Sequence, residues 1–462
     1  MRMRGFSVFV LTTTSAIAYA QPAPLAYDLD QAITSALATS GAPSVSVAVV
    51  RDKSIAYAKA FGKADIASDR PANAQTRYAV GSISKQFTAS AILLMQEQGK
   101  LSLDDKVAKY FPDLTRANEV TIRELLSHTS GYEDYAPQDY IIPEWTKPIT
   151  PREIMDRWAK KPLNFDPGTK WEYSNTNYVI AGEIFEKVSG RALLEFLHEK
   201  IFEPLNMTTA AGIFEKSPAD ATAYTRFALG PPRAVAREGR GWMFAAGELA
   251  MIPSDLARWD IAFMEKRILS PRSYDEFTRP VKLASGTDTH YALGLGIGEM
   301  NGVPMISHSG EVSGFLAVNM VFPTKGVAVA VCSNEDGVNL IGPLARRIAQ
   351  MALGPSQAVA PETELSQVRG ILEGLQAGRI DRQLFTDDAN AYFTDTALAD
   401  YRSSLQPLGK LTSVERTAEQ HRGGMIHRSY RAQFEKRTLQ LNVYVMPDGK
   451  YEQFLVEEQV GS

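Results

Sequence analysis

The stretch Tyr78-Ala-Val-Gly-Ser-Ile-Ser-Lys-Gln-Phe-Thr88 predicts the start of a helix that carries two side chains able to react together. Ser82 and Lys85 are three residues apart, so in a helix they lie on one face, one turn apart. A serine hydroxyl becomes a good nucleophile when a neighbouring base takes its proton, and burial lowers the pKa of a lysine enough for that task. The backbone N–H groups of a helix N-terminus can also stabilise an oxyanion. About 1.4 S-x-x-K matches are expected by chance, so the alternative is an ordinary helix start.

A second motif, Tyr173-Ser-Asn175, follows a loop that contains proline and glycine. A tyrosine near Lys85 could exist partly as phenolate and carry a proton between Ser82 and a leaving group. Asn175 could donate its amide to a substrate carbonyl. The alternative is that Asn175 caps a helix expected over Tyr178–Val188, a role that is compatible with substrate binding.

A third motif, His308-Ser309-Gly310, comes at the expected end of an apolar strand and is followed by Glu311. A glycine there lets a substrate backbone approach the strand closely. The N–H of Glu311 could complete an oxyanion hole with the N–H of Ser82. The alternative is an ordinary strand end.

Around these motifs, the apolar spacing predicts strands near both ends of the first 353 residues and a mainly helical segment over residues 82–279 between them. This order is typical of an α+β fold, with one antiparallel sheet flanked by helices and a helical insertion. The expected strands are Ser44–Val50, Ile55–Phe61, Met305–His308, Leu316–Phe322 and Val327–Cys332, and the expected helices include Asp28–Thr39, Gln86–Gln98 and Ile341–Leu353.

The N-terminus has the layout of a secretory signal peptide over residues 1–20. Arg2 and Arg4 precede a short apolar run, and Ala18-Tyr-Ala20 supplies a small-x-small cleavage site before Gln21. The alternative, a membrane anchor, would need a longer and uninterrupted apolar run. We therefore expect an exported protein, periplasmic or extracellular, without a membrane segment after cleavage.

The composition changes at residues 354–361, which we interpret as a linker between a catalytic domain over residues 21–353 and a small α+β accessory domain over residues 362–462. The accessory domain loosely resembles small cystatin-like or nuclear-transport-factor-like folds. Its expected elements are a helix over Glu362–Ala377 and strands over Met425–Phe434, Thr438–Val445 and Tyr451–Val456.

The chain is 44% hydrophobic and 22% charged, as in soluble globular proteins, and its formal charge of −4 argues against a nucleic-acid partner. A single cysteine, Cys332, excludes an intrachain disulfide and is expected to be buried in a strand. The scattered histidines show no metal-ligand spacing, so we expect no metal and no cofactor. His128 is interpreted as structural, and the oligomeric state stays open.

Taken together and in this order, the three motifs resemble the serine β-lactamase and penicillin-binding protein superfamily, in its class C β-lactamase-like branch. That branch includes D-alanyl-D-alanine carboxypeptidases, D-aminopeptidases and β-lactamase-like esterases. The resemblance covers about residues 28–353 and includes Leu125-Leu-Ser-His-Thr-Ser-Gly131. It implies a β-lactamase/transpeptidase-like fold with Ser82 as the acylated nucleophile, Lys85 as its activating partner, Tyr173 as general base and acid, Asn175 as a contact to the substrate amide, and His308 in place of the usual lysine.

Class C β-lactamases generally carry Lys-Thr-Gly where this chain has His308-Ser309-Gly310. Histidine is mostly neutral near pH 7, and at this position it resembles the carboxypeptidase and D-aminopeptidase members. We therefore expect an exported serine hydrolase that cleaves D-amino-acid peptides first, small esters second and β-lactams third. The alternative is a non-catalytic receptor of the same fold that binds penicillin or peptidoglycan fragments.

Overall fold

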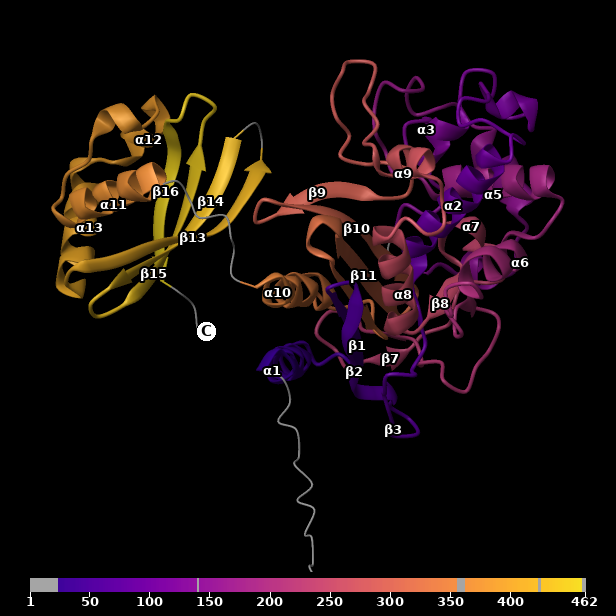
Figure 1. Ribbon diagram of the computed structural model, residues 1–462, viewed down its shortest axis with the longest axis horizontal. Helices are drawn as coiled ribbons and strands as arrows, with labels where there is room; N and C mark the ends of the chain where they lie inside the picture. Colours follow the sequence, from indigo (N-terminus) through magenta and orange to yellow (C-terminus); the bar gives the residue numbers. More distant parts are fainter. Residues whose placement is uncertain (1–23, 139–140, 355–361, 423–424, 459–462) are drawn as a thin grey trace, which may run out of the picture.

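The computed structural model describes residues 24–138, 141–354, 362–422 and 425–458 (Figure 1). The expected signal peptide, residues 1–20, lies outside the described residues, and so does the expected linker apart from Gly354. Both assignments therefore stay predictions.

A seven-stranded antiparallel sheet forms the centre of the first 353 residues, with strand order β3-β2-β1-β12-β11-β10-β9. Strands from both ends of this region meet in the middle of the sheet, where Val45 pairs with Ser333 and Val50 with Ala328. The predicted antiparallel sheet is confirmed. Its strands are β1 (Ser44–Arg51), β2 (Ser54–Asp65), β3 (Arg70–Pro71), β9 (Gly296–Met300), β10 (Val303–Val312), β11 (Phe315–Phe322) and β12 (Val327–Ser333).

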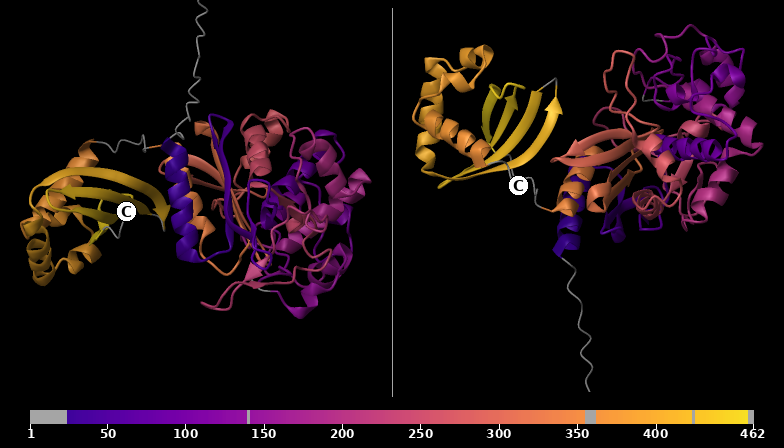
Figure 2. Two further views of the ribbon diagram at one scale, coloured as in Figure 1. Left: turned by 90° about the horizontal axis from the view of Figure 1, so that it is seen from below. Right: turned by 45° about the horizontal axis from the view of Figure 1, so that its top comes forward.

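Helices cover both faces of this sheet, because its central strands are apolar on both sides (Figures 1 and 2). On one face, α1 (Pro24–Ser40) and α10 (Ile341–Leu353) pack against each other and bury a core with Leu29, Val329 and Ile348. On the other face, α8 (Pro253–Met264) packs on β1 and β12.

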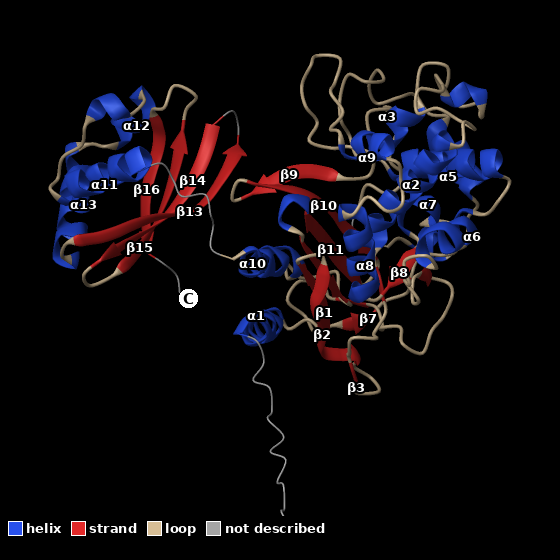
Figure 3. Cartoon of the chain, viewed as in Figure 1, coloured by secondary structure: helices blue, strands red, loops and turns tan. Residues whose placement is uncertain are grey.

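The segment between β4 (Tyr78–Ala79) and β9 forms the predicted insertion and shares a large core with the second face of the sheet (Figure 3). It is less uniformly helical than predicted, because β4 pairs with β8 and β8 pairs with β5 in a small sheet of its own. Its elements are α2 (Ser84–Glu97), α3 (Ile122–Leu126), α4 (Pro151–Ile154), α5 (Asn175–Ser189), α6 (Leu193–Leu197), β5 (Ala211–Gly212), β6 (Tyr224–Thr225), β7 (Arg233–Ala234), α7 (Phe244–Gly247), β8 (Leu249–Met251) and α9 (Pro271–Thr278).

Two local expectations are corrected by the structure. The strand that carries the third motif does not end at His308, because β10 stays paired with β11 as far as Val312, opposite Phe315. Helix α2 begins at Ser84, two residues before the expected Gln86, and Ser82 precedes it in a 3-10 turn over Gly81–Ile83. The turn and β10 are packed against each other.

The C-terminal unit has a separate core, in which three helices cover one face of the four-stranded antiparallel sheet β13-β14-β15-β16 (Figures 1 and 3). We did not predict α12, α13 or β13. Strand β13 is rich in charged and polar residues because it forms one edge of the sheet. The elements are α11 (Glu362–Gln376), α12 (Asp387–Tyr392), α13 (Asp395–Leu405), β13 (Leu411–Arg422), β14 (Met425–Phe434), β15 (Thr438–Val445) and β16 (Tyr451–Glu458).

The helices in the described residues are all too short or too polar to cross a lipid bilayer. Cys332 is buried in β12, as expected from the apolar residues around it.

Candidate active site

Ser82 and Lys85 meet at the start of α2, at the spacing that the sequence indicates. The Lys85 ammonium is fully buried and donates three hydrogen bonds: 2.9 Å to Ser82 Oγ, 2.7 Å to Asn175 Oδ1 and 2.9 Å to the backbone oxygen of Ala246. A lysine side chain has three N–H donors, so its hydrogen bonding is complete. The amine is therefore held rigidly against the serine hydroxyl.

Burial also changes the acidity of this amine. Because charge is costly away from water, desolvation lowers the pKa of Lys85 to about 7, although the nearby carboxyl group of Asp134 acts in the opposite direction. A pKa near neutrality means that a large fraction of the Lys85 side chains carry no proton at pH 7. A neutral amine next to Ser82 can accept the hydroxyl proton.

Tyr173 reaches the same serine from the loop before α5. Its hydroxyl donates a 2.8 Å hydrogen bond to Ser82 Oγ, and its ring lies 4.9 Å from Lys85 Nζ. Burial raises the pKa of Tyr173 well above its ordinary value, so the resting side chain is a neutral phenol. The partial phenolate that we considered from the sequence is therefore wrong for the resting site, where Tyr173 is a proton donor.

His128 holds the loop that carries Tyr173. It is fully buried, its ring packs on the Tyr173 ring with centroids 4.2 Å apart, and its Nδ1 accepts the backbone N–H of Ser174 at 3.1 Å. Burial and the nearby Lys85 lower the pKa of His128 well below its ordinary value. The neutral ring is a positioning group, in agreement with the structural role that we expected.

Asn175 connects Lys85 to Asp134, a residue that the sequence reasoning missed. Asp134 accepts the backbone N–H of Asn175 at 2.9 Å and its side-chain amide at 3.2 Å. Asn175 is the first residue of α5 and Ser174 is the N-cap, so the alternative in which Asn175 caps this helix is wrong. The only sequence signal for Asp134 is its place three residues after Gly131, at the end of the segment that carries the family resemblance.

The glycines of the first and third motifs allow the turn and the strand to touch through their backbones. A Cβ atom on Gly310 would lie 1.9 Å from the backbone oxygen of Val80 and 3.2 Å from the nitrogen of Ser82. A Cβ atom on Gly81 would lie 2.6 Å from the nitrogen of Glu311. The N–H groups of Ser82 and Glu311 thus belong to two segments in direct contact, as an oxyanion hole built from both of them would need.

His308 lies two residues before Gly310 in β10, whereas Glu311 follows Gly310. Its Nδ1 is 2.5 Å from the backbone oxygen of Ser309 and its Nε2 is 2.8 Å from the Tyr291 hydroxyl. Burial, together with the charge of Lys85, lowers the pKa of His308 to about 4, so the ring is neutral at pH 7. Since a carbonyl oxygen can only accept, Nδ1 carries the proton and Nε2 accepts from Tyr291. The position therefore offers no fixed cation to a substrate carboxylate.

All eight predicted site residues lie together at one cleft of about 650 Å³. Six of them line it directly, while Lys85 and Gly310 are buried beside it. Besides Glu311, four further carboxylates that we did not predict from the sequence line the cleft, and none of its described lining residues is a lysine or an arginine. The four carboxylates belong to Glu133, Asp134, Glu172 and Glu238.

The site contains a nucleophile, an amine that can act as base, a phenol that can deliver a proton, and two adjacent N–H groups. These are the components of acyl transfer through a serine ester. Across the described ranges, His, Cys, Asp and Glu nowhere gather in a group of three that could hold a metal ion.

The chain is similar to known proteins in sequence and in fold. A family model described as Beta-lactamase matches residues 29–352. The protein of Bacillus subtilis (strain 168) that bears the name penicillin-binding protein PbpX is 27% identical over 305 residues, which cover 66% of this chain and 73% of that protein. A D-aminopeptidase of Cereibacter sphaeroides is 29% identical over 297 residues, which cover 64% of this chain. The match spans 57% of that D-aminopeptidase, less than two thirds of its length.

The fold is also shared with a solved structure, that of an octameric penicillin-binding protein homologue from Pyrococcus abyssi. The two chains superpose with a TM-score of 0.63 at 23% sequence identity. The superposition covers 93% of this chain and 99% of the other, so the likeness in fold extends beyond the first 353 residues into the C-terminal unit.

Proposed function

Because this chain belongs to the beta-lactamase family, we propose that it is a serine hydrolase that forms an acyl-enzyme on Ser82. One observation carries the proposal: Ser82 Oγ accepts one hydrogen bond from Lys85 Nζ at 2.9 Å and a second from the Tyr173 hydroxyl at 2.8 Å. A serine in an ordinary helix start has no need of a buried amine and a phenol at its hydroxyl. A serine that must lose its proton and return one to a leaving group needs both.

In the acylation step, the neutral amine of Lys85 takes the proton of Ser82 as Oγ attacks the substrate carbonyl carbon. The N–H groups of Ser82 and Glu311 hold the negative oxygen of the tetrahedral intermediate. The proton then passes through the Lys85 and Tyr173 pair to the leaving nitrogen or oxygen, whose bond to the carbonyl carbon breaks. The Tyr173 hydroxyl regains a proton from Lys85, so the pair ends as it began.

In the deacylation step, a water molecule takes the place of the leaving group next to Tyr173. The Lys85 and Tyr173 pair removes a proton from the water as it attacks the serine ester, and the same two N–H groups hold the second oxyanion. Breaking the ester returns a proton to Ser82 Oγ and releases the acid product.

We propose peptides and amides of D-amino acids as the first substrate class, small carboxylic esters as the second and β-lactams as the third. The D-aminopeptidase among the relatives supports this order. So does His308, because a neutral ring gives the carboxylate of a β-lactam no fixed positive charge. We also propose that the protein is exported to the periplasm or the extracellular space, on the pattern of residues 1–20 alone.

Covalent labelling tests the nucleophile. We expect a fluorescent fluorophosphonate to label the wild-type protein and Ser309→Ala, and to leave Ser82→Ala unlabelled. Ser309 is a matched control because it lines the same cleft, while Lys85 donates its three hydrogen bonds to Ser82, Asn175 and Ala246. Equal labelling of Ser82→Ala and the wild type would contradict the proposal.

Turnover then separates an enzyme from a receptor. The wild-type protein is assayed in parallel with a D-alanine p-nitroanilide, a p-nitrophenyl ester and a chromogenic cephalosporin, and we expect steady-state product in that order of kcat/KM. A stoichiometric burst without further product would instead favour the non-catalytic receptor.

A further inference from the structure

Glu238 places a buried carboxylate oxygen without a partner at the wall of the cleft. The residue lies in the loop between β7 and α7, and only 5% of it is exposed. Its Oε1 accepts two hydrogen bonds from Ser313, from the backbone N–H at 2.9 Å and from the hydroxyl at 2.7 Å. Its Oε2 has no hydrogen-bond partner within the described part of the chain. A buried polar atom left in this way is costly unless a ligand or solvent pairs with it.

The other carboxylates of the cleft have partners of their own. Glu133 forms an ion pair with Lys161 at 2.8 Å, Asp134 accepts from Asn175, and Glu172 accepts a hydrogen bond from Asn164. Glu238 therefore differs from them, because Ser313 holds one of its carboxylate oxygens and the second has no hydrogen-bond partner among the described residues.

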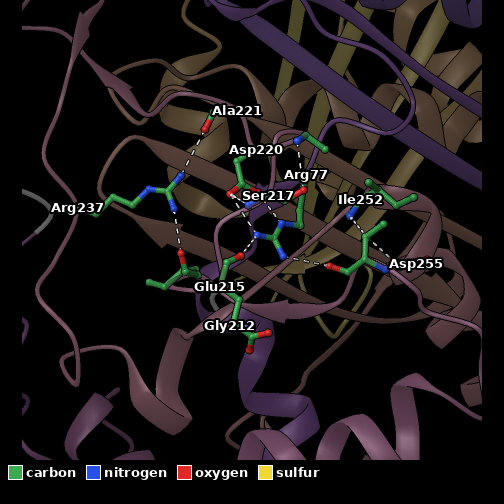
Figure 4. Close-up of polar contacts among 12 residues, drawn as sticks. Arg77, Gly212, Glu215, Ser217, Asp220, Ala221, Arg237, Ile252 and Asp255 are labelled. Carbon is green, nitrogen blue, oxygen red and sulfur yellow. Dashed lines mark hydrogen bonds and ion pairs between the residues drawn. The ribbon is translucent and has the colours of Figure 1, made fainter.

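The arginine next to Glu238 does not neutralise it. The guanidinium of Arg237 donates to the backbone oxygens of Ile213 at 3.2 Å and Ala221 at 3.4 Å, and stacks over the ring of Phe315. Figure 4 shows this side chain directed toward Ala221, beside the buried ion pair of Arg77 and Asp220. The guanidinium thus faces backbone carbonyls and is absent from the cleft lining, where the described residues include no lysine or arginine.

The position of Glu238 indicates which part of a substrate it meets. Tyr173 delivers the proton to the leaving group, and the rings of Tyr173 and His308 are 6.4 Å apart, so the leaving group lies at the His308 end of the third motif. Glu238 is held by Ser313, which follows β10 beyond Gly310 in the opposite direction. Each strand residue adds about 3.3 Å, so Val312 at the end of β10 is about 7 Å past Gly310, and Ser313 follows it in the turn to β11. The acyl part of the substrate extends that way.

We propose that Glu238 binds a primary ammonium group on the acyl part of the substrate, and so selects amides and esters of amino acids that carry a free amine. The inference rests on the proposed acyl-enzyme function and adds a specificity residue to it. An ammonium group supplies the donor that Oε2 lacks and the positive charge that the acidic cleft lacks, and a charge-assisted hydrogen bond is among the stronger contacts of this kind. Both an α-amine and a side-chain amine have this chemistry.

The test compares Glu238→Gln with the wild type on three p-nitroanilides: D-alanine, Nα-acetyl-D-lysine and N-acetyl-D-alanine. Glutamine keeps an oxygen for Ser313 and removes the charge. We expect kcat/KM to fall about 10- to 100-fold, mainly through KM, on the substrate whose amine reaches Glu238. A lower kcat/KM on the D-alanine substrate would show that Glu238 binds the α-amine. A lower kcat/KM on the Nα-acetyl-D-lysine substrate would show that it binds the side-chain amine. We expect N-acetyl-D-alanine, which has no ammonium group, to be turned over equally by both proteins.

Two outcomes would overturn the inference: no change on either amine substrate, or an equal loss on all three, which would make Glu238 a purely structural residue. Glu172→Gln is the matched control, because that carboxylate also lines the cleft but already has Asn164 as partner. The rate of fluorophosphonate labelling is measured for every variant and reports on the acyl-enzyme function separately.

A binding measurement keeps the two proposals distinguishable if the wild type is not labelled. Calorimetric titration of Ser82→Ala with D-alanine amide and with Nα-acetyl-D-lysine amide probes the ammonium subsite without chemistry. Binding that is lost in Ser82→Ala/Glu238→Gln supports the subsite even if acyl transfer fails. Binding that is equal in both proteins, or absent from both, overturns it.

Discussion

At Ser82, two donors of very different acidity point at one oxygen atom. Lys85 holds its proton weakly, because burial lowers its pKa to about 7, whereas burial makes the Tyr173 phenol hold its proton more strongly than usual. The same desolvation thus moves an amine and a phenol toward their neutral forms. A neutral amine and a neutral phenol are the base and the acid that acyl transfer needs at pH 7.

The rate of acylation should therefore follow the protonation of Lys85. Below pH 7 the amine carries a proton and cannot accept another, so we expect the fluorophosphonate labelling rate to fall about tenfold per pH unit there and to level off above pH 7. The pKa of His308 is lowered to about 4, so this ring stays neutral above pH 5 and adds no step of its own to the pH profile. The measurement is a pH profile of labelling between pH 5 and pH 9.

Asp134→Asn provides the control for that assignment. The Asp134 carboxyl group raises the pKa of Lys85 through its charge, so its loss should move the midpoint of the profile to lower pH. A flat profile, or a midpoint that does not move, would show that Lys85 is not the titrating base.

At the scale of elements, activity depends on how closely the turn over Gly81–Ile83 approaches β10. Neither Gly81 nor Gly310 has room for a side chain, and Gly81 also has a φ of +51°, in the left-handed region. Two backbone segments that touch can place one N–H each beside the same substrate oxygen. A bulkier residue at either point would separate them.

Gly310→Ala should accordingly remove most of the activity. The added Cβ would meet the backbone oxygen of Val80 at 1.9 Å, so β10 or the turn must move, and we expect a cost of about 1–3 kcal/mol in unfolding free energy. Loss of one oxyanion donor should lower kcat by about 10²–10³. Ester turnover and chemical denaturation measure the two effects.

Gly298→Ala in the neighbouring strand β9 is the matched control. A Cβ there would meet only the Met305 methyl group, at 3.9 Å, so we expect activity and stability close to those of the wild type. Similar kcat values for Gly310→Ala and the wild type would contradict the proposed oxyanion hole.

At the scale of the whole molecule, the buried apolar side chains form separate clusters. Two clusters lie on the two faces of the seven-stranded sheet, and a third belongs to the C-terminal unit alone. Every described residue that lines the cleft comes from the first 353 residues. Strand β13 of the C-terminal unit lies beside β9, the edge strand of the seven-stranded sheet (Figure 1).

Residues 21–354 should therefore fold and react without the C-terminal unit. We expect this truncated protein to hydrolyse the p-nitrophenyl ester with an unchanged kcat and to unfold in one cooperative transition, because its cores are retained intact. Ester kinetics and calorimetry make the comparison with the full-length chain. A truncated protein that folds but has lost its activity would place part of the catalytic machinery in the C-terminal unit.

Much of this protein can be predicted from its sequence, because the signals are local. The Ser82 and Lys85 spacing, the apolar run of β1 and the amphipathic helix α10 each depend on neighbours along the chain, and the structure agrees with all three. The elements that we missed were those with weak local signals, such as the polar edge strand β13.

Only the tertiary structure decided how far the pKa values shift and which residues from distant segments contact one another. That the pKa of His308 falls to about 4, that Tyr173 rests as a phenol and that Glu238 has an oxygen without a hydrogen-bond partner among the described residues all result from burial among residues far apart in the sequence. Residue types and their spacing were enough to indicate which groups react. How strongly each group holds its proton depends on how much water the folded chain leaves around it, and a linear sequence does not contain that quantity.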